Sequence, residues 1–353
     1  MNQVLNINQC ASLIAAVGQQ VTVLIQGHSG SGKSSIVSAV GQSFPAHRQM
    51  VIDCTLLDVG DVQIPAVDHD SKTSTFYPND IFGTDSNQPV IVMLDEFGKA
   101  SRPVQNALLP LMLERRIGRY ALPSGSIVFG TTNLGAEGVG DTMQMHARNR
   151  ISVVEMRKPT SEEWLVWAGD NEVDAAVMAW AHETPQIFQS FGDVTAPSDN
   201  PYIFHPREQR KAFVTPRSLY LASEIVKKRD VIRDDFAVQM GIAGTLGIRA
   251  AADLMAFVVL ADDLPRRQSI IDSPETARVP KSPAAMVMVA FNCVGAVEKS
   301  TLDNFLIYIQ RLPTEIQAVF ATQLVRNRSK QVFAAQNRRM AEFVSKNSWV
   351  IVG

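Results

Sequence analysis

The sequence has little cysteine and almost no net charge. Its 353 residues include only three cysteines, Cys10, Cys54 and Cys293. They are too few and too scattered for a disulfide framework or a zinc site, and the six histidines show no paired-ligand spacing. The formal net charge of −2 argues against a protein coated in basic patches for nucleic acid. We therefore expect a reducing, cytoplasmic setting.

Segments typical of export or of a membrane are also missing. The N-terminal residues lack a basic segment followed by an apolar core, so we expect no signal peptide. The most apolar long stretch, residues 284–297, contains Asn292 and is too short to span a bilayer. We expect no membrane partner.

The sequence does contain a complete phosphate-binding motif. The apolar run at residues 21–26 predicts a buried strand, and a helix is expected to begin at Lys33. Glycines between them permit backbone conformations in which successive N–H groups surround a polyphosphate. We expect Lys33 to bind the β- and γ-phosphates and Ser34 to ligate Mg²⁺, whereas a flexible loop is the alternative. The candidate nucleotide-binding residues are Gly27, His28, Ser29, Gly30, Ser31, Gly32, Lys33, Ser34 and Ser35.

A second expected strand ends in two acidic residues. Residues 89–94 are mostly apolar and lead directly to Asp95 and Glu96. This pattern is typical of a central parallel strand, at whose carboxyl end open α/β sheets hold their ligands. Asp95 is therefore a candidate Mg²⁺ ligand, and Glu96 is a candidate base that orients the attacking water. Without the phosphate motif, the same residues would also suit an exposed helix cap.

Polar and basic residues at later positions complete the candidate catalytic set. Asn133 follows another expected strand and can hydrogen-bond the attacking water or the γ-phosphate. Arg148 and Arg150 come just before the last expected strand, and Arg217 opens a helix much later. Guanidinium groups stay charged and form paired hydrogen bonds with phosphate oxygens. Each of the three arginines could instead form a surface or interface salt bridge.

Short apolar runs alternate with helical stretches over the first 157 residues, which predicts a doubly wound α/β fold with a parallel sheet. The expected strands are residues 21–26, 50–54, 91–94, 126–131 and 151–156. Helices dominate from residue 159 onward, and the longest is expected at residues 235–260. We expect a nucleotide-binding domain at 1–157, a helical lid domain at 158–265 and a helical C-terminal extension at 266–353.

These motifs, in this order, resemble the AAA+ ATPases, and within them the MoxR-like branch. The resemblance rests on the phosphate loop, Asp95-Glu96, Asn133 as sensor 1, Arg150 in an Asn-Arg-Phe-like context and Thr-Pro-Arg217 as sensor 2. Residues 56–65 also look like the segment that MoxR-like proteins carry after their second strand. Because Ile151 replaces the usual aromatic residue, the choice between Arg148 and Arg150 stays open.

The resemblance implies an ATPase that uses ATP and Mg²⁺ and assembles into a homo-oligomeric ring, usually a hexamer. Arg150 or Arg148 would reach the γ-phosphate bound by the neighbouring subunit, and Arg217 would contact the nucleotide of its own subunit. The resemblance further implies a protein client, and MoxR-like proteins commonly work with a partner that has a von Willebrand factor A-type domain.

Two other functions stay open. A DNA-associated AAA+ motor or loader is the main alternative, although the near-neutral composition makes nucleic acid the less favoured partner. A nucleotide-gated assembly protein with negligible turnover is disfavoured because Glu96 is present. The DNA alternative depends on basic residues that could also form a solvated helix face, namely Arg326, Arg328, Lys330, Arg338 and Arg339.

Overall fold

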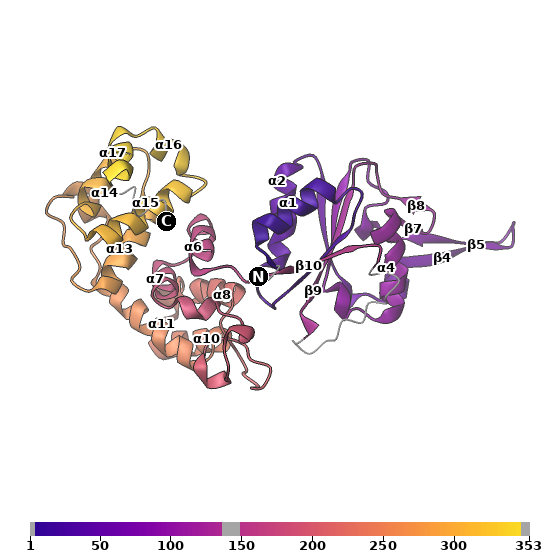
Figure 1. Ribbon diagram of the computed structural model, residues 1–353, viewed down its shortest axis with the longest axis horizontal. Helices are drawn as coiled ribbons and strands as arrows, with labels where there is room; N and C mark the ends of the chain where they lie inside the picture. Colours follow the sequence, from indigo (N-terminus) through magenta and orange to yellow (C-terminus); the bar gives the residue numbers. More distant parts are fainter. Residues whose placement is uncertain (1–3, 136–148, 347–353) are drawn as a thin grey trace. The chain divides into compact units, whose positions relative to one another are not determined.

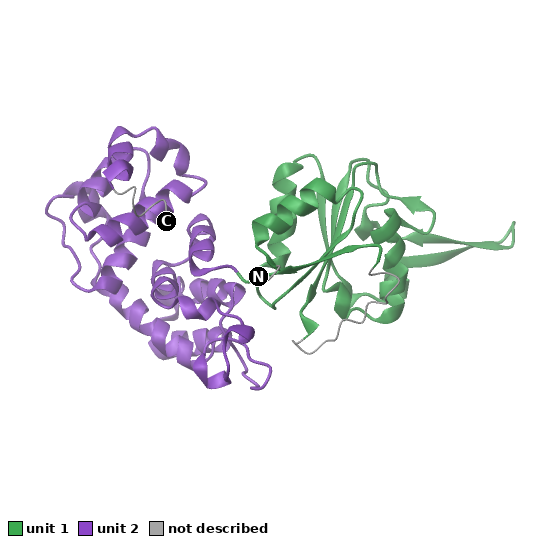
Figure 2. Cartoon of the chain, in the orientation of Figure 1, with its two compact units in different colours: residues 1–158 green, residues 159–353 purple. Residues whose placement is uncertain are grey.

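The computed structural model describes residues 4–135 and 149–346. The chain divides into two compact units, residues 1–158 and residues 159–353 (Figure 2). The first unit combines a sheet with helices, and the second is built of helices (Figure 1). Arg148 lies outside the described residues.

A six-stranded sheet forms the centre of the first unit. Its strand order is β1-β10-β2-β9-β6-β3, and every neighbouring pair is parallel. All five strands expected from the sequence belong to it, and the predicted fold class is confirmed. The strands are β1 (Val4–Leu5), β2 (Val23–Gly27), β3 (Arg48–Asp53), β6 (Val90–Asp95), β9 (Ile127–Asn133) and β10 (Ser152–Met156).

Helices cover both faces of this sheet (Figure 1). On β6, Val92 packs in a cluster with Leu108 of α4, while the next residue, Met93, packs in a second cluster with Ile14 of α1 and Ile36 of α2. Because successive side chains of a strand point to opposite faces, burial on both faces requires the continuous apolar run seen in the sequence. The helices are α1 (Ile7–Val17), α2 (Ile36–Ser43) and α4 (Arg102–Glu114).

Two antiparallel hairpins accompany the sheet. The longer one extends outward from the first unit (Figure 1), and the ring of its Tyr77 lies 5.9 Å from that of Tyr120 in the shorter one. Neither hairpin was expected from the sequence. The elements of this region are α3 (Val59–Val62), β4 (Gln63–Asp68), β5 (Thr73–Pro78), β7 (Arg116–Ile117) and β8 (Tyr120–Ala121).

The helices of the second unit share one hydrophobic cluster, which includes residues from Trp164 to Phe343. The predicted subdivision at residue 265 stays a prediction. The helices are α6 (Ser161–Asp170), α7 (Ala175–Glu183), α8 (Pro216–Val226), α9 (Arg229–Ile232), α10 (Asp235–Leu246), α11 (Ile248–Leu260), α12 (Arg267–Asp272), α13 (Pro283–Ala296), α14 (Leu302–Ile309), α15 (Thr314–Arg326), α16 (Gln331–Ala335) and α17 (Arg338–Lys346).

The prediction of a single helix at residues 235–260 is wrong. Gly247 separates α10 from α11 with a φ of 92°, a left-handed conformation that ends a helix and favours glycine. Within the described ranges, no helix is both long enough and apolar enough to cross a membrane.

Candidate functional site

Strand pairing brings three of the predicted positions to one edge of the sheet. Gly27 at the end of β2 pairs with Asn133 at the end of β9. In the neighbouring pair, Leu94 of β6 lies opposite Gly130 of β9, which places Asp95 beside Thr131. Since these strands are parallel, their carboxyl ends meet at the same edge, where open α/β sheets bind ligands.

The phosphate loop leaves this edge and turns into a helical segment. Gly30 and Gly32 have φ angles of 68° and 97°, which side-chain-bearing residues rarely adopt. A Cβ atom on Gly27 would lie 3.1 Å from the carbonyl oxygen of Met156 on β10, so the backbone approach is close there too. After the loop, Lys33–Ser35 form one 3₁₀ turn that continues into α2. The chain therefore needs its glycines to make the turn before the helix.

Lys33 joins the loop to β9. Its side chain is buried, and its Nζ donates hydrogen bonds to the carbonyl oxygens of Gly27 and His28, both at 2.9 Å. The same ammonium donates to Asn133 Oδ1 at 2.7 Å. The structure thus brings two predicted residues from different motifs into direct contact around one buried cation.

Asp95 and Glu96 form a second linked group. Ser34 Oγ donates to Asp95 Oδ2 at 3.3 Å, so the two predicted metal ligands lie together. Glu96 takes a left-handed conformation with φ of 51° and begins a 3₁₀ turn over Phe97–Lys99. Its carboxylate oxygen Oε2 lies 3.1 Å from Lys99 Nζ. The strand therefore ends in a tight turn, in which Asp95 contacts Ser34 while Glu96 contacts Lys99.

These residues fit a magnesium-bound triphosphate. The Oγ of Ser31 is buried and has no hydrogen-bond partner among the described residues. A buried unpaired hydroxyl is costly unless a ligand satisfies it, and it lies in the loop that would hold the phosphates. Mg²⁺ binds through one or two carboxylates, substrate phosphates and water, which matches the oxygen pair of Ser34 and Asp95. In the described part of the chain, no group of three or more His, Cys, Asp or Glu residues suits a different metal.

Arg150 lies far from its own phosphate loop. It is exposed and precedes the first residues of β10, whereas the loop follows the last residue of β2. Because Ser152 pairs with Val23 and Met156 with Gly27, Arg150 and the phosphate loop lie at opposite ends of these two strands. β10 has five residues and Arg150 lies in the turn before it, so the strand alone puts roughly 13 Å between Arg150 and the edge at Met156. The structure therefore does not bring Arg150 to its own phosphate loop.

Arg217 belongs to the second unit. It is the second residue of α8 and is exposed. The helix begins with a capping box, in which Thr215 Oγ1 accepts from the backbone N–H of Ser218 at 3.0 Å. The cap holds Arg217 in the first turn of the helix, as the Thr-Pro-Arg sequence predicts.

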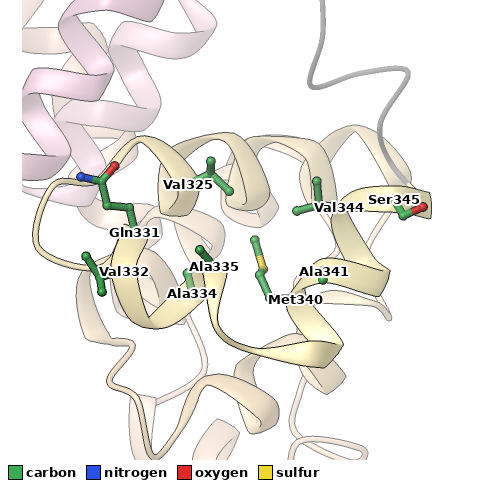
Figure 3. Close-up of a pocket in the computed structure, with 9 residues that line it drawn as sticks. All are labelled: Val325, Gln331, Val332, Ala334, Ala335, Met340, Ala341, Val344 and Ser345. Carbon is green, nitrogen blue, oxygen red and sulfur yellow. The ribbon is translucent and has the colours of Figure 1, made fainter.

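A pocket in the second unit does not compete as a phosphate site. It lies between α15, α16 and α17, and Figure 3 shows mostly small apolar side chains around it. No charged residue is part of its lining, so it offers nothing to neutralise a polyphosphate. The lining residues are Val325, Gln331, Val332, Ala334, Ala335, Met340, Ala341, Val344 and Ser345.

Thr131 and Lys99 were not expected as site residues. The hydroxyl of Thr131 donates a hydrogen bond to Asp95 Oδ1 and accepts one from the backbone N–H of Glu96 at 3.3 Å. The sequence could have indicated Thr131, because side chains two residues apart in a strand lie on the same face. Thr131 precedes Asn133 by two residues and therefore shares its face of β9. Lys99 lies one helical turn after Glu96, a spacing that is common for ion pairs.

No protein-family model and no curated protein matches the sequence. Among solved structures, the chain is similar to RuvB of Thermotoga maritima, described as a Holliday junction branch migration motor, with 15% identity, 86% of each chain covered and a TM-score of 0.39. A point mutant of the same protein gives 15% identity over 87% of this chain and 90% of that chain, with a TM-score of 0.40.

NtrX of Brucella abortus in complex with ADP is also similar, with 15% identity and a TM-score of 0.34. The similarity covers 96% of this chain and 65% of that chain. Similarities this weak do not bear on function, which has to be judged from the site itself.

Proposed function

We propose that the protein is an ATP-hydrolysing mechanochemical protein of the AAA+ class, in the MoxR-like branch, that remodels or activates a protein partner. The observation that carries the proposal is the Lys33–Asn133 hydrogen bond beside the Ser34–Asp95 pair at one edge of the sheet. A cation, an amide and a metal-binding oxygen pair together are what the transfer of a γ-phosphoryl group requires.

Each residue has a defined task in this reaction. The loop N–H groups and Lys33 bind the phosphates, and Asn133 hydrogen-bonds the γ-phosphate or the attacking water. Glu96 orients that water for in-line attack. Ser34 and Asp95 would hold Mg²⁺, which would supply neutralisation of the charge that develops on the phosphate oxygens. When ATP binds, Lys33 has to exchange its present acceptors for phosphate oxygens. Because one of these acceptors is Asn133 of β9, the exchange couples the phosphate loop to β9.

The position of Arg150 supports a shared site between subunits. An arginine at the opposite end of β10 from its own loop could reach the nucleotide of a neighbouring copy, and a ring, as in AAA+ hexamers, gives every copy such a neighbour. Arg217 would contact the nucleotide of its own subunit. When the γ-phosphate leaves, Arg217 would lose its contact with the nucleotide. The lid domain would then change orientation and act on the client.

A protein client is favoured over nucleic acid, and a partner with a von Willebrand factor A-type domain is the client type we propose. One member of the C-terminal basic set is engaged within the chain: Lys330 Nζ donates to the carbonyl oxygens of Val294 and Gly295 at 2.5 and 2.6 Å. A cation that is held in this way contributes less to attraction for phosphate backbones.

The test of the proposal is ATP turnover by the wild-type protein and by Glu96→Gln. The substitution keeps the size of the side chain but removes the carboxylate, so we expect ATP binding to persist while phosphate release falls by about 100-fold or more. A matched control is Glu114→Gln, which alters an exposed acid paired with Arg116 at 2.5 Å. Near-normal steady-state hydrolysis by Glu96→Gln would sink the assignment.

The DNA alternative is tested by titrating duplex and single-stranded DNA at low salt with ATP present. Protein remodelling predicts weak binding and no stimulation of hydrolysis. Tight, salt-sensitive binding that stimulates hydrolysis several-fold would favour the DNA motor instead, provided that it disappears when the C-terminal basic set is neutralised, namely Arg326, Arg328, Lys330, Arg338 and Arg339.

A further inference from the structure

We propose that Thr131 is a positioning residue for the hydrolytic reaction: its hydroxyl orients the metal-binding carboxylate of Asp95 and the turn that carries Glu96. This inference rests on the proposed ATPase function and deepens it. Thr131 is fully buried near the end of β9, next to β6, and lies on the same face of its strand as Asn133.

The hydroxyl makes two different hydrogen bonds to adjacent residues. It donates to Asp95 Oδ1, and it accepts from the backbone N–H of Glu96 at 3.3 Å. Asp95 Oδ1 is thereby occupied on the protein side, which turns Oδ2 toward Ser34 Oγ at 3.3 Å. One threonine therefore decides which carboxylate oxygen is presented together with Ser34 to a divalent cation.

The hydrogen bond from the N–H of Glu96 to Thr131 also supports the unusual backbone of Glu96. A left-handed conformation at a side-chain-bearing residue persists only where the surroundings hold it, and φ at Glu96 is 51°. The N–H of Glu96 is shared between Thr131 and Asp95 Oδ1, the latter at 3.2 Å. The following residue of β9 packs closely against the same turn, because a Cβ atom on Gly98 would lie 2.3 Å from Thr132 Oγ1. The end of β9 thus contacts the turn at two points, and Thr131 supplies the hydrogen bond.

The hydroxyl is isolated by comparing Thr131→Ser with Thr131→Ala, which differ from each other only in that group. Ser126→Ala is the matched control. Ser126 is also buried and also both donates and accepts, to Pro123 O at 2.7 Å and from Val90 N–H at 3.1 Å, but it precedes β9 at the opposite edge. Its loss should affect stability without affecting the metal.

Two readouts are measured for each folded variant. The first is Mn²⁺ affinity in the presence of ADP, followed by the electron paramagnetic resonance signal of free Mn²⁺, and the second is kcat and KM for ATP at saturating Mg²⁺. Loss of a residue that orients a metal ligand typically costs about 10- to 100-fold in metal affinity or activity. We expect Thr131→Ala to weaken Mn²⁺ binding about 10-fold and to lower kcat by a similar factor, with little change in KM. Thr131→Ser and Ser126→Ala should stay within about threefold of the wild type.

Two results would overturn the role of the hydroxyl. In one, Thr131→Ala keeps the wild-type Mn²⁺ affinity and kcat. In the other, Thr131→Ala and Thr131→Ser lose Mn²⁺ affinity and kcat equally. If Thr131→Ala does not fold, Thr131→Val, which fills the same volume, replaces it. Failure of both to fold would also overturn the proposal, since the hydroxyl would then serve stability. A wild-type protein without ATP turnover would instead remove the proposed function, and the two failures are distinguishable.

Discussion

Replacement of Lys33 by alanine should weaken ATP binding more than 100-fold. The buried ammonium of Lys33 donates to Gly27 O and His28 O at 2.9 Å and to Asn133 Oδ1 at 2.7 Å. With ATP bound, phosphate oxygens replace some of these neutral acceptors, and a charge-assisted hydrogen bond contributes about 1.5–3 kcal/mol. For contacts to both the β- and the γ-phosphate, less the bonds that the amine gives up, we expect a net loss of about 3 kcal/mol. That loss raises Kd by more than about 100-fold.

The free energy of unfolding should change much less than the affinity. Alanine leaves three acceptors without this donor, but it also removes a buried cation, and these effects oppose each other. We expect a net change of about 1 kcal/mol without nucleotide. Titration calorimetry with a non-hydrolysable ATP analogue and urea unfolding measure the two quantities.

A matched control for Lys33→Ala is Lys330→Ala, which truncates another lysine whose ammonium donates to two backbone carbonyls, in the second unit. It should leave the affinity for the analogue unchanged. A folded Lys33→Ala protein that binds within about threefold of the wild type would refute the reasoning.

Further predictions concern the shared site and the cysteines. Arg150→Ala should bind ATP normally but lose hydrolysis, and mixing it with Lys33→Ala should restore some phosphate release; no recovery in confirmed co-assemblies would count against a site shared between subunits. The three cysteines should resist alkylation by iodoacetamide at mildly alkaline pH while the protein is folded. Burial raises the pKa of Cys10 to about 11 and that of Cys54 to about 12, and it raises the pKa of Cys293 as well, so the reactive thiolate is scarce. Mass spectrometry counts the modified thiols, and rapid labelling of the folded chain would disprove the burial.

The central strands could be predicted from the sequence because both of their faces are buried. β6 contains Val90 through Leu94, each without exposed surface, and therefore appears as one uninterrupted apolar run. The phosphate loop was equally visible, because its glycines and Lys33 are fixed in spacing by the backbone that must surround a phosphate. The residues expected to meet at the end of the strands follow from the parallel arrangement alone.

Other features depend on contacts that a single sequence does not reveal. The β4–β5 hairpin exposes Ile64, Val67 and Tyr77, so its strands lack the alternation of buried and exposed residues that marks a half-buried strand. The break at Gly247 was missed since an isolated glycine inside a helical pattern is often tolerated. The contact of Thr131 with Asp95 depends on the register between β6 and β9, which only the structure fixes.

A crystal structure of the Glu96→Gln protein with ATP and Mg²⁺ is the most direct test of the nucleotide site. We expect the β- and γ-phosphates within hydrogen-bonding distance of Lys33 Nζ and the metal between Ser34 and Asp95. Asn133 should then face the γ-phosphate, with its present bond to Lys33 lengthened or broken. ATP bound elsewhere on the chain, or a phosphate loop that stays empty at saturating ATP with Lys33 still held by Gly27, His28 and Asn133, would contradict the assignment.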